Sequence, residues 1–337
     1  MKRRTCRFIL HPSSFLMSPT FQKRRDQLRA LYGFDFPEDL FRFWEFVNRL
    51  RPLEPLQALF DTLNLQLTGP FEVLAGRFDG RTPRQSILLH WRYYNDPPEF
   101  FTVLVGDIDG LHYGYWLDDP RTGKGGVASY FSDDAFELTP DGDSLFEAVR
   151  LDLEERARDL ADYREENPEE GAEFNAALDK VAALRAILRR FATDDRPETG
   201  EEYVERYLDR AARARKKRTI AATQEGMGIV VHPEVYRPLS VTDKKLWRRL
   251  WKEDDPVELV EEARQALRDS FPGTTLKLGK ELWAIGGERK TDYAYELLDA
   301  AYTALGREVL VEVLRAHRAG RDRPWLDVLQ EGEPPND

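Results

Sequence analysis

Among the many acidic side chains, Asp269 has a distinctive position, at the predicted C-terminus of a helix. The chain has 61 Asp and Glu residues against 50 Lys and Arg, and most of these carboxylates are expected to be solvated. Asp269 follows a predicted helix, Pro256 to Leu267, and precedes the turn Ser270-Phe271-Pro272-Gly273. There it faces the negative end of the helix dipole, which is expected to raise its pKa slightly. A raised pKa suits a general base, but acids at the ends of surface helices are also common, so position alone does not decide.

The histidines and the single cysteine do not form a recognisable metal motif. Of the five histidines, only His90 and His112 are expected to lie close together, on neighbouring strands. Two histidines without a third ligand indicate packed or hydrogen-bonded side chains rather than a metal site. Cys6 alone excludes an internal disulfide and a thiolate-rich zinc site. We therefore expect no metal and no cofactor bound by this chain.

Signatures of self-contained enzymes are also missing from the sequence. There is no G-x-S-x-G elbow, no G-x-x-x-x-G-K-[ST] phosphate loop and no H-E-x-x-H motif. The loop Gly123-Lys124-Gly125-Gly126 lacks the following helix that a phosphate cradle needs. A stand-alone enzyme is not indicated.

The charge balance disfavours a general nucleic-acid-binding surface. The formal net charge is −11 and the pI is near 5.2, so an anionic partner would have to meet a local basic patch. One such run is Arg213 to Arg218, RARKKR. It could bind phosphate, or its cations could compensate the dipole at a helix end. We favour the second interpretation and expect no direct nucleic-acid binding.

A central stretch, Leu88 to Pro120, predicts an antiparallel meander in the first half of the chain. Runs rich in β-branched and aromatic residues, separated by Asn, Asp, Pro and Gly, are typical of strands with tight connections. The three predicted strands are Ile87 to Tyr94, Phe100 to Val105 and His112 to Leu117. Because proline donates no backbone hydrogen bond, Pro97-Pro98 is expected at the bend between the first two strands.

Helical patterns dominate the rest of the sequence. Predicted helices lie at Phe21–Leu31, around Leu40–Val47, from Leu145 onward with breaks at Asn167-Pro168 and at 197–200, and at Thr242–Trp251, Pro256–Leu267 and Asp292–His317. A short strand pair is expected within Leu63–Ala75. The predicted fold class is α+β, an N-terminal mixed domain with an antiparallel sheet followed by a mainly α-helical C-terminal domain.

These patterns suggest domain boundaries. We expect a disordered leader at 1–20, the α+β domain at 21–150, a helical connection at 151–215 that is part of the second domain, a mainly helical domain at 216–325 and a disordered tail at 326–337. The first residues faintly resemble a signal peptide, but His11 and Pro12 break the apolar run. We favour a leader, or a true start at Met17. No run approaches the length of a spanning helix, so a cytoplasmic location is expected, or a nuclear one in a eukaryote.

One motif carries a family resemblance. The stretch Leu89 to Phe100, LHWRYYNDPPEF, resembles the signature of the histone PARylation factor family. Further pieces follow in family order, among them Leu31-Tyr32-Gly33-Phe34, Phe36-Pro37-Glu38-Asp39, Phe43-Trp44, Leu74-Ala75-Gly76, Gly142-Asp143, Tyr236-Arg237, Leu276-x-Leu278-Gly279 and Ala301-Tyr302. The resemblance covers about residues 31 to 318 and is stronger in the first half.

This resemblance implies an accessory factor. Proteins of this family dock on the catalytic domain of a DNA-damage-responsive ADP-ribosyltransferase of the poly(ADP-ribose) polymerase type. They contribute a glutamate that deprotonates an acceptor serine, which directs ADP-ribose from NAD, held by the transferase, to serine on histones and other targets. A positioned carboxylate base is typically worth 10²- to 10⁴-fold.

At the catalytic position that the resemblance implies, this sequence differs from the family pattern in two residues. Counting back without gaps from Leu276, the family's glutamate falls on Asp269 and the preceding, transferase-contacting acid on Arg268. The base would be about 1.5 Å shorter, one C–C bond, and the neighbouring charge is reversed. A shifted register would recruit Glu262 or Glu261 instead. Tyr236-Arg237 matches the family pair whose arginine binds the transferase.

Two hypotheses follow from this match and the two departures together. The chain is either an accessory factor that supplies a base, or a non-catalytic interaction module with a different partner.

Overall fold

The computed structural model describes residues 18–132, 137–207, 209–320 and 326–330. Its strands are β1 (Gln66–Leu67), β2 (Phe100–Val105), β3 (Leu111–Trp116), β4 (Gly126–Phe131) and β5 (Thr139–Gly142). Its α-helices are α1 (Pro19–Tyr32), α2 (Glu38–Leu50), α3 (Phe60–Leu63), α4 (Pro70–Leu74), α5 (Leu145–Glu166), α6 (Gly171–Ala192), α7 (Gly200–Tyr207), α8 (Arg210–Arg218), α9 (Asp243–Lys252), α10 (Val257–Arg268), α11 (Pro272–Ile285), α12 (Glu288–Ala304) and α13 (Glu308–Ala319).

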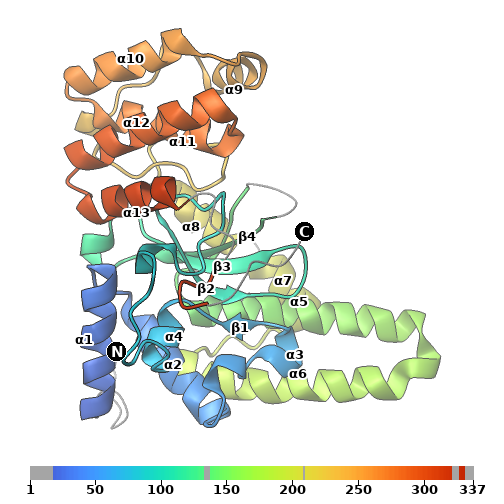
Figure 1. Ribbon diagram of the computed structural model, residues 1–337. Helices are drawn as coiled ribbons and strands as arrows, with labels where there is room; N and C mark the ends of the chain where they lie inside the picture. Colours follow the sequence, from blue (N-terminus) through green and yellow to red (C-terminus); the bar gives the residue numbers. More distant parts are fainter. Residues whose placement is uncertain (1–17, 133–136, 208, 321–325, 331–337) are drawn as a thin grey trace, which may run out of the picture.

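An antiparallel sheet in the order β1-β2-β3-β4-β5 forms the centre of the N-terminal half (Figure 1). Strands β2 and β3 confirm two of the three predicted strands. The third prediction was wrong, because Ile87–Leu89 forms a 3₁₀ helix, η2, and Trp91 adopts a positive φ of 54°. The sheet is completed by β1, β4 and β5 instead. Pro97-Pro98 therefore precedes β2 without joining two strands.

Helices around the sheet follow the amphipathic patterns. Helix α1 ends at Gly33 in the left-handed conformation, with φ 80°, as a C-cap glycine allows. Helix α2 begins after Pro37 and buries Phe43 and Phe46 completely. The predicted strand pair at 63–75 was half wrong, because helix α4 follows the two-residue strand β1.

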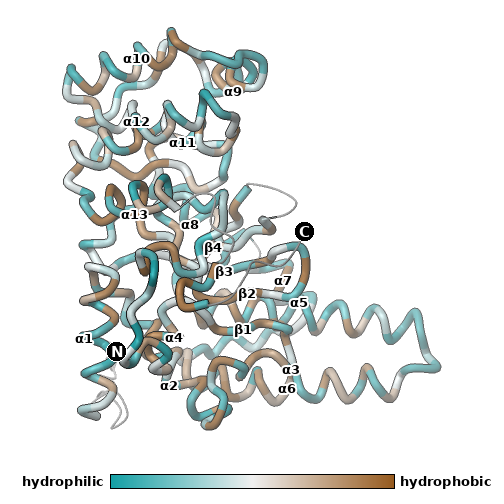
Figure 2. The backbone as a smooth tube through the Cα atoms, viewed as in Figure 1, coloured by the Kyte–Doolittle hydropathy of each residue, from teal (hydrophilic) through white to brown (hydrophobic). Residues whose placement is uncertain are grey.

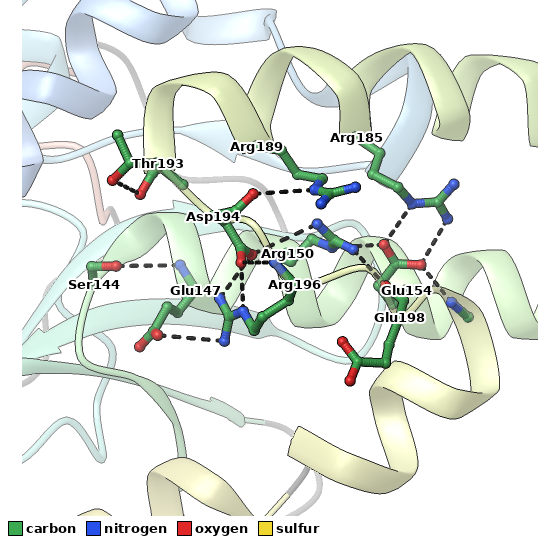
Figure 3. A network of polar contacts seen from close by, with 12 residues as sticks. Ser144, Glu147, Arg150, Glu154, Arg185, Arg189, Thr193, Asp194, Arg196 and Glu198 are labelled. Atoms are coloured by element: carbon green, nitrogen blue, oxygen red, sulfur yellow. Dashed lines mark hydrogen bonds and ion pairs between the residues drawn. The ribbon is translucent and has the colours of Figure 1, made fainter. Parts of the chain in front are cut away.

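Helices α5, α6 and α7 pack on this N-terminal half, and α5 and α6 form a hairpin that projects from it (Figure 1). The far end of the hairpin is hydrophilic (Figure 2). At its base, Arg150 and Glu154 are buried and ion-paired at 2.7 Å, and Glu154 also accepts from Arg185 and from the backbone of Gly200 (Figure 3). Helices α5 and α8 also contact strand β5 of the sheet, and the domain boundaries stay a prediction.

The C-terminal half is a stack of helices α9 to α13 above the sheet (Figure 1). Helix α11 lies at its centre, with every residue from Pro272 to Leu282 buried. The sequence analysis missed α11, because a helix buried on all sides lacks the alternating polar face that reveals a surface helix. The predicted helix 292–317 is divided at Gly306, which has φ 65°.

Buried ion pairs join the two halves. Lys280 of α11 lies 2.9 Å from Glu225 and 3.3 Å from Glu99, and its ammonium stands 4.2 Å from the centre of the Trp116 ring. Arg215 of α8 pairs with Asp118 at 2.5 Å. Arg215, one member of the basic run 213–218, is therefore buried. Its neighbours Lys216, Lys217 and Arg218 are exposed in the last turn of α8, where cations can compensate the helix dipole.

The segment 326–330 packs against the N-terminal half, which corrects the expected disordered tail in this part. The backbone carbonyl of Leu326 accepts from the N–H of Trp91 at 2.8 Å, and Val328 and Leu329 are buried. Similarly, α1 begins at Pro19, inside the expected leader. The remainder of both predicted segments lies outside the described residues.

The α+β fold class, a sheet-containing first half followed by a mostly helical second half, is confirmed. In the part of the chain that the structure describes, no helix is long and apolar enough to cross a membrane.

Candidate functional site

The C-terminus of helix α10 places Asp269 in a fixed turn. Ser270 adopts a left-handed conformation, with φ 69°, and the N–H of Phe271 donates to the carbonyl of Ala266 at 2.8 Å. This is the hydrogen-bond pattern of a Schellman C-cap, formed here with serine where glycine is usual. A non-glycine residue in this conformation is mildly strained, and such strain is found at functional sites.

Both carboxylate oxygens of Asp269 are occupied by donors. The Gln265 side-chain amide donates to Oδ1 at 2.7 Å, and Nη2 of Arg237 donates to Oδ2 at 3.0 Å. These two hydrogen bonds, Gln265 first, lower the pKa of Asp269. The expectation of a slightly raised pKa was wrong, because direct donors outweigh the weak field of the helix end. The side chains of Asp269 and Arg237 remain 37% and 46% exposed.

Arg237 is held by hydrogen bonds at its backbone and by two contacts at its guanidinium. Its N–H donates to the Thr274 hydroxyl at 3.0 Å, and that hydroxyl donates back to the Arg237 carbonyl. The guanidinium carbon lies 4.7 Å from the centre of the Phe271 ring, a cation–π distance. The loop can approach α11 closely because Gly273 has no side chain, and a Cβ there would lie 2.9 Å from the Val235 carbonyl.

Tyr236 and Arg237 divide between core and surface. Tyr236 follows a short 3₁₀ helix, η5 (Pro233–Val235), and packs against the hydrophobic core. Burial raises the pKa of its hydroxyl. Arg237, next in the chain, points its guanidinium at Asp269. Tyr236 therefore anchors the loop in the core, and Arg237 keeps a partly exposed guanidinium beside Asp269.

Arg268 is directed to Gln265. Its Nε and Nη2 donate to Gln265 Oε1 at 3.0 and 2.7 Å. The Gln265 amide thus lies between the two charged neighbours. Its oxygen accepts hydrogen bonds from Arg268, and its nitrogen donates one to Asp269. Sequence reasoning missed Gln265, although its spacing of four residues before Asp269 places both on one helix face.

The alternative bases Glu261 and Glu262 lie elsewhere on α10. Glu262 accepts from the N–H and the hydroxyl of Ser240, at 2.5 and 2.7 Å. Glu261 accepts from Arg264 at 2.5 Å. They precede Asp269 by about two helical turns, roughly 10–12 Å along the axis. The structure brings Asp269, Arg237, Arg268 and Gln265 together and leaves both glutamates apart from that cluster.

The two candidate histidines are each bound to a separate carboxylate. His90 contacts Glu72, and Nε2 of His112 lies 3.0 Å from Asp96. Among the described residues, no three His, Cys, Asp or Glu side chains are placed to hold a metal ion. His112 lies in β3 as expected, whereas His90 lies outside the sheet, so the two histidines are not on neighbouring strands.

The Asp269 cluster has a limited chemical capacity by itself. A carboxylate can accept a proton, but an exposed one exchanges protons with water. A surface that covers it would exclude water and position an acceptor within hydrogen-bond reach. The cluster combines a partly exposed carboxylate, an adjacent cation and a supporting turn.

Comparisons with known proteins agree over almost the whole chain. A family model described as Histone PARylation factor 1 matches residues 23–321. The Bos taurus protein named Histone PARylation factor 1 is 29% identical over 325 residues, covering 90% of this chain and 89% of the relative. The Mus musculus protein of that name is 28% identical over 338 residues, covering 94% and 92%. The Danio rerio protein is 28% identical over 327 residues, covering 91% and 88%.

Proposed function

The chain belongs to the histone PARylation factor family, and from this membership we propose that it docks on an ADP-ribosyltransferase of the poly(ADP-ribose) polymerase type. In this proposal Asp269 is the general base that directs ADP-ribose to serine. The observation that carries it is the contact between Asp269 and Arg237 at 3.0 Å. These residues are 32 positions apart in the chain, yet the fold places the proposed base beside the proposed docking arginine.

The proposed reaction divides its parts between two proteins. In this proposal NAD is bound by the transferase. The acceptor serine oxygen forms a bond to the anomeric carbon of the ribose while the bond to nicotinamide breaks. The hydroxyl proton passes to Asp269. Because a serine hydroxyl is a weak nucleophile at neutral pH, the base supplies a large part of the rate.

Arg237 couples docking to the availability of the base. In the free chain its guanidinium occupies Oδ2 of Asp269, and this contact helps to lower the pKa of the carboxylate. A partner that binds the Arg237 guanidinium frees one carboxylate oxygen of Asp269. It also removes one cause of the lowered pKa of Asp269. The base then becomes competent where a covering surface and an acceptor are also present.

A serine ADP-ribosylation assay tests the proposal. It combines a transferase, NAD, a histone-tail peptide and either the wild-type chain or Asp269→Asn. We expect hydroxylamine-resistant serine product with the wild type and a loss of 10²- to 10⁴-fold with the variant. Glu262→Gln is the matched control, since it removes an acid of the same helix outside the cluster. Absence of serine product from a wild-type chain that binds the transferase would refute the proposal.

A second candidate function is a non-catalytic interaction module. The observation that favours it is Arg268, which puts a cation beside the proposed base and where the resemblance implies an acid. In this case the chain would bind a different partner and would not alter the acceptor. Equal product distributions with and without the chain, together with an unrelated protein recovered in a pull-down, would support the module, whereas binding to a transferase that is lost in Arg237→Ala would count against it.

A further inference from the structure

A chain of hydrogen bonds runs through the side chain of Gln265 to the proposed base. The Gln265 amide nitrogen donates to Oδ1 of Asp269 at 2.7 Å, and the amide oxygen accepts from Nε and Nη2 of Arg268 at 3.0 and 2.7 Å. Nη2 of Arg237 donates to the other carboxylate oxygen, Oδ2, at 3.0 Å. The carboxylate of Asp269 therefore lies between two donors, one neutral and one charged.

The two neighbours of Gln265 fix the orientation of its amide. A guanidinium can only donate hydrogen bonds, and an ionised carboxylate can only accept them. Arg268 therefore requires the amide oxygen and Asp269 requires the amide nitrogen, so both favour the same one of the two possible amide orientations. An acid at position 268 would instead compete with Asp269 for the amide nitrogen.

The two donors on Asp269 differ in how they depend on a partner. Gln265 lies four residues before Asp269, a spacing at which side chains on a helix meet, so this contact belongs to α10 alone. Arg237 comes from a loop 32 positions away, its side chain is 46% exposed, and in the proposed function it moves to the transferase. Docking therefore opens Oδ2 and leaves Oδ1 bound to Gln265.

A fixed Oδ1 is useful because the carboxylate of an aspartate rotates easily. The terminal torsion of aspartate is broad and roughly two-fold, so the backbone turn at Ser270 does not set the plane of the Asp269 carboxylate. A hydrogen bond to one oxygen sets that plane and directs the other oxygen. A general base must lie within hydrogen-bond reach of the proton that it takes, and misplacement by about 1 Å can cost on the order of 10²-fold in rate.

We propose that Gln265 is a positioning residue for serine transfer, which holds Oδ1 of Asp269 so that Oδ2 takes the hydroxyl proton, and that Arg268 fixes the Gln265 amide for this task. The serine O–H bond breaks as its proton binds Oδ2, the serine oxygen bonds to the anomeric carbon, and nicotinamide leaves with the electron pair of its bond to the ribose. This inference rests on the proposed function and deepens it, because it names the oxygen that accepts the proton. It also gives Arg268 a place in a working site.

Kinetics of serine transfer at saturating transferase test this inference. Gln265→Met keeps the length and helix propensity of the side chain and cannot donate. We expect kcat to fall by about tenfold to a hundredfold, with the KM of the peptide and the affinity for the transferase within about twofold of the wild type. Gln265→Glu, which still accepts from Arg268 but cannot donate when ionised, should show the same loss.

The pH–rate profile separates positioning from a merely structural role. The Gln265 hydrogen bond is the largest cause of the lowered pKa of Asp269, ahead of the contact with Arg237. Its loss raises that pKa, and because the base acts in its deprotonated form, the acid limb of the profile should move to higher pH in Gln265→Met. A structural role would lower the amount of folded protein, which circular dichroism measures, and leave the position of the limb unchanged.

Arg268 is tested by whether its effect passes through Gln265. Arg268→Met should lower kcat by a smaller factor than Gln265→Met, and the double variant should be no slower than Gln265→Met alone. Arg264→Met is the matched control: it removes an arginine of the same helix that pairs with Glu296 and Glu261, and we expect kcat within about twofold of the wild type.

The outcomes distinguish failure of this inference from failure of the proposed function. A wild-type kcat and pH profile in Gln265→Met would overturn the positioning role and leave the proposed function intact. Additive effects of Gln265→Met and Arg268→Met would overturn the role given to Arg268. Absence of serine product from a wild-type chain that binds the transferase would refute the proposed function, and this inference with it.

Discussion

Two groups of polar side chains in this molecule differ in how completely the protein encloses them. The motif Leu89 to Phe100 is enclosed: Arg92 donates to the carbonyls of Leu88, Pro97 and Phe100, the last at 2.6 Å, and Asp96 is fully buried against His112 and Tyr130. The Arg237–Asp269 pair has a comparable ion-pair length and is about 40% exposed. The stretch that carries the clearest family resemblance is thus scaffold.

The difference shows what each group can do. A buried charge that loses its partner is costly, so the partners of Arg92 and Asp96 cannot be exchanged without damage to the fold. An exposed ion pair contributes little stability, so its members can change partners. The first group therefore supports the fold, and the second is the group on which the proposed docking and chemistry depend.

The largest predicted effect is on the stability of the buried group. Asp96→Asn removes the buried carboxylate that accepts from Tyr130 and faces Arg92, and it leaves the buried Arg92 guanidinium without that compensating charge. We expect a loss of about 3–5 kcal/mol of stability at pH 7, measured as a lower denaturation midpoint. A change below about 1 kcal/mol would show that enclosure does not distinguish the two groups.

A second acid, the partly buried Asp152, should change stability in a pH-dependent way. Burial, with help from Glu155 and Asp159, raises the pKa of Asp152 to about 7, against the hydrogen bond from Tyr113. The folded state therefore holds a proton that the unfolded chain releases near pH 4, and this contribution to stability is lost as pH rises from about 4 to about 7. Asp152→Asn should match the wild type near pH 4 and exceed it at pH 8 by about 1–2 kcal/mol, in parallel urea titrations. An equal offset at both pH values would contradict the assignment.

The smallest predicted effect is the stability coupling in the exposed pair. A double-mutant cycle with Arg237→Ala and Asp269→Ala should give a coupling close to zero, as is usual for exposed ion pairs. Thermal denaturation of the four proteins measures it. A coupling as large as the loss expected for Asp96→Asn would mean that the pair is structural and not free to change partners.

The sequence predicted these two groups unequally, for physical reasons. Strands β2 and β3 and the amphipathic helix α10 follow local periodicity. The run at Ile87 has the aromatic content of a strand, but His90 and Trp91 are fixed by distant partners, Glu72 and Leu326, and no local pattern records those contacts. Asp269 could be placed at a helix end, whereas its contact with Arg237 depends on how α10, α11 and the preceding loop pack.

The most direct test of the central claim compares the two groups in one assay of serine transfer per bound complex. Wild type, Asp269→Asn and Asp96→Asn are each measured with a transferase at saturating concentration, below their denaturation midpoints. We predict that Asp269→Asn keeps its thermal midpoint and its affinity and loses at least 10²-fold in rate, whereas folded Asp96→Asn keeps the wild-type rate. The opposite pattern, serine transfer retained in Asp269→Asn and lost in folded Asp96→Asn, would contradict the account.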